Sequence, residues 1–140
     1  MNIQKLMLAL LSFGTMGISK PIDSTTRCYI SSLLLGCLHG FTNQRILAKK
    51  GQRPNHFFAK RSLTEFAPEL ATGLVYIGFN EFALSQTSGF AQPGVRRQCL
   101  VFHGLGQMLG EMSTLNDDPK LNFALMWGSL GCAWDFITQR

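Results

Sequence analysis

The sequence predicts an all-α protein, a small helical bundle of four or five short helices that we expect to be embedded in a membrane. Three observations support this prediction. No stretch of useful length alternates apolar and polar residues with a period of two, which argues against β-strands. Only 15% of the residues are charged, against about 25% in ordinary soluble domains. Residues 28–44 contain no Asp, Glu, Lys or Arg and run directly into a basic segment, which is typical of a membrane helix at its cytoplasmic end.

The first segment, residues 1–19, has more than one interpretation. Lys5 precedes an uncharged stretch that ends at Ser19. These features suit a signal peptide cleaved after Ser19, and they equally suit a first membrane helix or a buried helix. We expect residues 20–140 to form a single helical membrane domain, because a chain of 140 residues supplies one hydrophobic core and not two.

The second segment predicts a helix over residues 27–50. Thr25 or Thr26 can cap its first turn, and Gly51 suits the left-handed position that follows a helix. At about 1.5 Å per residue such a helix reaches roughly 36 Å, which is enough to cross the hydrocarbon layer and enter the head groups.

A basic connection, residues 45–61, begins in the last turns of this helix and continues beyond it. Its cationic residues are Arg45, Lys49, Lys50, Arg53, Lys60 and Arg61. We expect these side chains to contact anionic lipid head groups on the cytoplasmic or matrix side of a bacterial or organellar inner membrane. The net charge of +5 does not indicate a nucleic-acid partner, because the cations gather in one connection and not along an aromatic-studded face.

A third helix is predicted to begin near a capping box formed by Ser62 and Glu65, with Pro68 in its first turn. We expect it to end at about residue 87. A turn rich in glycine and proline, residues 88–94, then leads to the next helix.

The fourth and fifth helices complete the expected bundle. The fourth is predicted over residues 95–112 and ends in a polar cluster, residues 113–118. Asp118 and Pro119 make a suitable N-cap and first residue for the fifth helix, which we expect to reach about residue 138.

Two glycine pairs indicate close helix packing. Gly36 with Gly40, and Gly106 with Gly110, have the GxxxG spacing that flattens one helix face and lets another backbone approach. A chain with 14 glycines also produces such pairs by chance. The spacing therefore predicts helix association, within the chain or with a partner subunit.

A polar stripe marks the fourth helix. His103, Gln107 and Glu111 recur every four residues on a helix otherwise rich in Leu, Val, Phe, Met and Gly. Glu69, Asn80 and Glu81 of the third helix are candidate partners of this stripe, and the alternative is that they mark a half-exposed face of that helix. Glu81 is the candidate that we single out, because in an apolar stretch the pKa of a carboxyl is raised and it would exchange protons near neutral pH. In lipid the stripe must face protein, water or a ligand; in a soluble bundle it is the wet side of an amphipathic helix.

Cofactor and metal motifs are weak. His39 and His103 are each followed by glycine, and two helical imidazoles are the minimum needed to hold a haem. Hydrogen-bonded core histidines are the commoner arrangement. The four cysteines lie in apolar segments without zinc spacing, which predicts buried free thiols and no metal site.

These observations predict no catalytic residues and favour a structural, assembly or accessory role in a membrane complex. The expected partners are the lipid bilayer and a membrane protein or second copy of this chain. One alternative is a membrane transporter or redox protein that uses the polar stripe. Another is a soluble or exported helical bundle that binds a hydrophobic ligand or a protein, since the mean hydropathy of +0.10 is low for a polytopic membrane protein.

Overall fold

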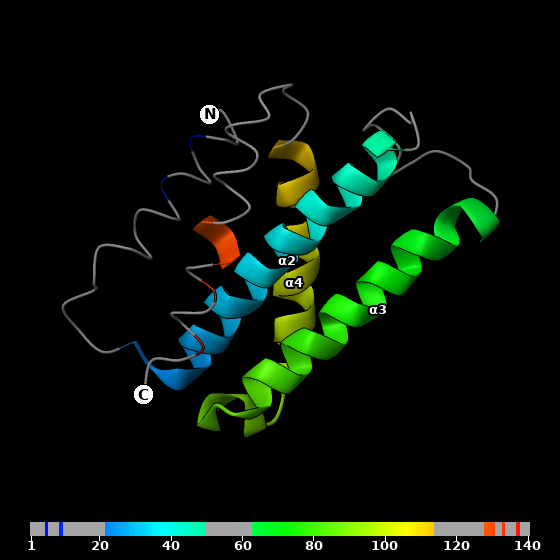
Figure 1. Cartoon of the computed structure of the whole chain (residues 1–140). Helices are drawn as coiled ribbons and strands as arrows, with labels where there is room; N and C mark the ends of the chain where they lie inside the picture. The colour runs from blue at the N-terminus through cyan, green and yellow to red at the C-terminus, as the bar shows by residue number, and fades with distance from the viewer. Residues whose placement is uncertain are drawn as a thin grey trace.

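The computed structural model describes residues 5, 9, 22–49, 63–113, 128–130, 133 and 137. Its described elements, in chain order, are α2 (Ser24–Lys49), α3 (Leu63–Ser85), the short 3-10 helix η1 (Ser88–Ala91) and α4 (Val95–Ser113). All regular structure within these ranges is helical, so the all-α prediction is confirmed (Figure 1).

The start of α2 differs from the prediction in its capping residue. The carboxylate of Asp23 accepts hydrogen bonds from the backbone N–H of Thr26 at 2.6 Å and from the Thr26 hydroxyl at 2.7 Å. Asp23 therefore caps the helix in place of Thr25 or Thr26, because its side chain reaches the free N–H groups of the first turn. These hydrogen bonds lower the pKa of Asp23 below its ordinary 3.8.

The helix α3 runs antiparallel to α2 (Figure 1). Cys28 near the start of α2 contacts Thr87 just after α3, with 2.9 Å between Sγ and Oγ1. Thr42 near the end of α2 pairs with Tyr76 in the middle of α3, at 2.8 Å between the two hydroxyl oxygens. The helix α3 begins at Leu63, so Pro68 lies inside the helix and not at its first position.

The helix α4 crosses α2 and runs parallel to it. The ring of Tyr29, near the start of α2, stacks on Phe102 with centroids 5.1 Å apart. Towards the other end, the side-chain amide of Asn43 donates a hydrogen bond to Glu111 at 3.3 Å. The order of these contacts is the same along both helices, so their N-termini lie at the same end of the bundle.

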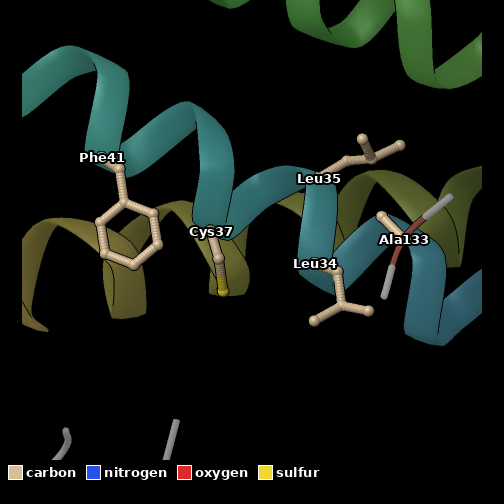
Figure 2. Packing of buried hydrophobic residues seen from close by; sticks show 5 residues of the cluster. All are labelled: Leu34, Leu35, Cys37, Phe41 and Ala133. Atoms are coloured by element: carbon tan, nitrogen blue, oxygen red, sulfur yellow. The ribbon is translucent and has the colours of Figure 1, made fainter. Parts of the chain in front are cut away.

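Two apolar clusters fill the described core. The first comprises Leu34, Leu35, Cys37, Phe41 and Ala133 (Figure 2). The second, near the start of α2, comprises Cys28, Leu84, Phe90, Val95 and Cys99. It joins the ends of all three long helices to η1, so this turn is anchored by Phe90, which is 4% exposed.

Several predicted features fall on residues that the structure does not describe. The first segment is described only at Lys5 and Ala9, and residues 50–62 and 114–127 lie outside the described ranges. Residues 128–130, 133 and 137 are helical, at positions that belong to the expected fifth helix. No helix among the described residues is both long enough and apolar enough to cross a membrane, so the crossing helices expected from the sequence find no support there.

Candidate functional site

The helices α2 and α4 meet backbone to backbone at both predicted glycine pairs. A Cβ atom added to each glycine would lie closer than 3.0 Å to a carbonyl oxygen of the other helix. The pairs are Gly36 with His103, Gly40 with Gln107, Gly106 with Leu33, and Gly110 with Cys37. Real Cβ atoms do not approach a backbone so closely. Only glycine therefore allows the two helices to pack at this distance.

The close approach brings together two buried histidines. Nδ1 of His39 lies 3.1 Å from Nε2 of His103, which is a hydrogen-bonding distance. Each residue is 3% exposed. The ring of His39 also stacks on Tyr76 of α3, with centroids 5.2 Å apart. One imidazole pair therefore links all three long helices.

Burial keeps both imidazoles neutral around pH 7. Burial, and to a smaller extent the neighbouring His39, lowers the pKa of His103 to about 4 from its ordinary 6.5. Burial also lowers the pKa of His39. The physical reason is that a charged ring loses its hydration inside the bundle.

The side chain of Asn80 extends the pair onto α3. Its Nδ2 lies 3.5 Å from Nδ1 of His103 and 3.5 Å from the hydroxyl of Ser32. With Nδ2 as donor, Nδ1 of His103 accepts, and the Nε2–H of His103 donates to Nδ1 of His39. This assignment leaves Nε2–H on His39, an atom that is buried with no described hydrogen-bond partner.

The rest of the polar stripe faces α2. Gln107 donates to Oε1 of Glu111 at 3.1 Å, and Asn43 of α2 donates to the same oxygen at 3.3 Å. Gln107 and Glu111 are half-buried, while His103 is buried. The three stripe residues therefore lie together along the α2–α4 contact and bond to protein groups.

The fourth predicted member, Glu81, lies elsewhere. It is exposed and pairs with Arg96 at 3.8 Å, and the guanidinium of Arg96 lies over the ring of Phe90. Its neighbour Asn80 occupies the buried position instead. The sequence offers Asn80 beside Glu81 as a candidate partner of the stripe. Asn80 stands four residues after Tyr76, on one face of α3, and this spacing is the signal that favours it over Glu81.

The described residues do not fit a haem between His39 and His103. A haem iron coordinated by both imidazoles, one on each face of the macrocycle, would hold the two ring nitrogens about 4 Å apart with the macrocycle between them. The nitrogens here bond directly to each other. A cavity of about 50 Å³ nearby, lined by Ile77, Asn80, Glu81, Phe90, Arg96, Cys99 and Leu100, is also far smaller than a haem.

Metal and thiol chemistry receive no support from the described residues either. No group of three or more His, Cys, Asp or Glu side chains within them is arranged to hold a metal ion. Cys28, Cys37 and Cys99 are buried and unbridged. Burial raises the pKa of Cys37 to about 12, so this thiol stays protonated and unreactive.

The predicted lipid-contacting cations are mostly not described. Arg45 is exposed near the end of α2, and Lys49 is the last residue of that helix. Lys50, Arg53, Lys60 and Arg61 lie outside the described residues.

Comparisons of the chain with protein-family models, with curated proteins and with solved structures find no match. The glycine contact and the buried polar network are therefore the features from which a function has to be inferred.

Proposed function

We propose that this protein is a small membrane-embedded protein with a structural or accessory role in a membrane complex. The observation that carries the proposal is the distribution of side chains about α3 and α4. Polar groups lie inside the bundle together with the two apolar clusters, and large apolar side chains also lie on its outside.

Among the described side chains of these two helices, ten large hydrophobic ones are exposed. They are Leu70, Leu74, Val75, Phe79 and Phe82 on α3, and Leu100, Val101, Leu105, Met108 and Met112 on α4. Val75 and Phe82 are each 70% exposed. Apolar surface of this extent is typical of a face that meets lipid or another protein.

The interior holds polar groups beside its two apolar clusters. Buried polar residues on the three long helices include Ser31, Ser32, His39, Asn43, Gln44, Asn80 and His103. In water this arrangement is unfavourable, because burying polar groups costs free energy and exposing apolar groups gives up hydrophobic stabilisation. In lipid the same arrangement is favourable, because ionisable and amide groups turn inward and small residues bring the helices together.

The apolar face of α4 has a defined length and a charged border. Val101, Leu105, Met108 and Met112 follow one another along one side of the helix, over roughly 16 Å at 1.5 Å per residue. Arg96 and Arg97 are exposed at its N-terminal end. We infer that this face lies in one leaflet with the two arginines at the head groups, an arrangement that needs no membrane-crossing helix.

A structural role fits how the polar stripe is used. His103 pairs with His39 and Glu111 accepts from Asn43 across the contact with α2, while Gln107 donates to Glu111 along α4. Such a network fixes the relative position of helices and leaves the outer apolar faces for lipid or for a partner helix.

The proposal is tested by adding charge to the outer faces. Val75→Glu and Val101→Glu, combined in one chain, place carboxylates on α3 and α4, and each costs up to about 3 kcal/mol at depth in lipid. Gln86→Glu adds one such charge in the exposed turn after α3 and is the control for a carboxylate away from the two faces. Membrane fractions from expressing cells are extracted with alkaline carbonate, and liposome flotation is measured with purified protein.

We expect the unmodified chain and the Gln86→Glu variant to stay with the membrane and to float with liposomes. The double variant should move to the supernatant while keeping its helical circular dichroism. Release of the unmodified chain by carbonate, together with a monodisperse protein in detergent-free buffer, would overturn the proposal and favour a soluble bundle.

A further inference from the structure

The buried histidine pair has a property that the structural role does not require. We propose that His39 and His103 form a pH-sensitive joint, which holds α2, α3 and α4 together while both rings are neutral and loosens when the pair takes up a proton. The inference stands on the hydrogen-bond geometry of the pair and does not depend on whether lipid or water surrounds the bundle.

The geometry leaves one place for an added proton. With the tautomers assigned above, the 3.1 Å gap between His39 and His103 holds one hydrogen, which Nε2 of His103 donates to Nδ1 of His39. The remaining ring lone pair is on Nδ1 of His103, which faces the side-chain amide of Asn80 at 3.5 Å. A proton there opposes the N–H of Asn80, so the amide has to turn or α3 has to move.

Among the side chains that the structure describes, the charged and titratable groups around the pair offer it no counter-ion. On α3, Tyr76 stacks on His39 and bonds to a hydroxyl. On α4, Glu111 accepts hydrogen bonds from Gln107 and Asn43. Two further carboxylates lie elsewhere, since Glu81 pairs with Arg96 and Asp23 caps α2. An imidazolium would therefore be buried without a described carboxylate beside it, which is costly.

The backbone contact between α2 and α4 keeps the protonated pair away from solvent. Gly36 and Gly40 press α2 against the carbonyl groups of His103 and Gln107, so the rings cannot reach water by a small side-chain rotation. Hydrating the charged pair requires the helices to separate.

The sign of the pH dependence follows from linkage. The folded protein binds the proton less readily than the unfolded chain, so stability is full above the ordinary histidine pKa and is lost as the pH falls towards the lowered value. For His103 alone, a pKa of about 4 in place of 6.5 raises the unfolding equilibrium constant roughly 60-fold between pH 7.0 and pH 4.5. The shift of His39 acts in the same direction.

The experiment measures guanidinium unfolding at pH 7.0 and pH 4.5, in buffer or in detergent micelles, whichever keeps the protein monomeric. His103→Gln keeps hydrogen-bonding capacity but does not titrate. His56→Gln, at the third histidine of the chain, is the matched control. The imidazole pKa values are measured in parallel by nitrogen-15 NMR.

We expect the unfolding equilibrium constant of the unmodified chain and of His56→Gln to rise at least about 60-fold between pH 7.0 and pH 4.5. In His103→Gln it should rise by a clearly smaller factor, which reports the contribution that His39 retains. In Asn80→Asp a carboxylate faces the imidazole, so the pKa of His103 should rise. Equal acid sensitivity in His103→Gln, or titration of His103 at its ordinary pKa in the unmodified protein, would overturn the inference. The NMR measurement on the unmodified chain decides the question even if a variant fails to fold.

Discussion

Replacing Gly106 by alanine should destabilise the bundle, although alanine is the better helix former. A Cβ atom on Gly106 would overlap with the backbone carbonyl group of Leu33 and approach the backbone nitrogen of Cys37. Backbone atoms cannot swing aside as the end of a side chain can. The methyl group must therefore push α2 and α4 apart.

The expected size of the effect comes from two opposing terms. Overpacking a close contact costs about 1–3 kcal/mol, and the helix propensity of alanine returns about 1 kcal/mol. Gly104 lies on the same helix, two residues away, and a Cβ there would meet nothing within 4 Å. Gly104→Ala should therefore gain about 0.5–1 kcal/mol. Because both variants share this propensity term, they should differ by the overpacking cost alone, about 1–3 kcal/mol, or roughly 3–10 °C in Tm.

Thermal unfolding followed by far-ultraviolet circular dichroism measures this difference, with all variants in the same detergent or buffer. The two substitutions are chemically identical, so composition and charge cancel in the comparison. A Gly106→Ala protein as stable as Gly104→Ala would refute the backbone contact between α2 and α4, and with it the register of the polar network.

Two further substitutions test the core and the start of α2. Leu35→Ala removes a side chain that is 1% exposed and should lower the free energy of unfolding by about 2–5 kcal/mol in chemical denaturation. The control Leu74→Ala, at a residue 64% exposed, should change it by less than about 0.5 kcal/mol. Similar losses in the two variants would mean that Leu35 is not in the core. Asp23→Ala should lower the Tm at pH 7, and because the pKa of Asp23 is lowered in the folded state, its contribution should vanish as the pH falls below 3.8 and the carboxylate is protonated; an equal difference at pH 7 and pH 2.5 would contradict its role as the cap.

The fold was predictable from the sequence where the local signals were strong. An uncharged run, turn residues and the absence of period-two alternation predicted the helices near residues 24–49, 63–85 and 95–113. The cap at Asp23 was missed because three neighbouring side chains, Asp23, Thr25 and Thr26, all suit that position. Which of them bonds to the first turn depends on a backbone angle that composition does not reveal.

The site was only partly predictable, because its members come from three helices. Helical spacing placed His103, Gln107 and Glu111 on one face, but it did not indicate what that face meets. Glu81 stood out as a charge in an apolar stretch, and a long charged side chain at a helix surface can reach solvent and a partner such as Arg96. The shorter Asn80 is buried one position earlier, on a face defined only by the packing of α3.

The glycine contact and the histidine pair are physically coupled. The carbonyl oxygen that crowds Gly36 belongs to His103 itself, and His39 lies between Gly36 and Gly40 on the same stretch of α2. An imidazole spans only a few ångströms from its Cα, so two of them form a direct hydrogen bond only when their backbones are held at a defined separation. A larger residue at either glycine would widen that separation, and the ring nitrogens would then need water between them. Close packing by glycine therefore lets two ionisable side chains satisfy each other inside the bundle, at a depth where neither has a described carboxylate partner.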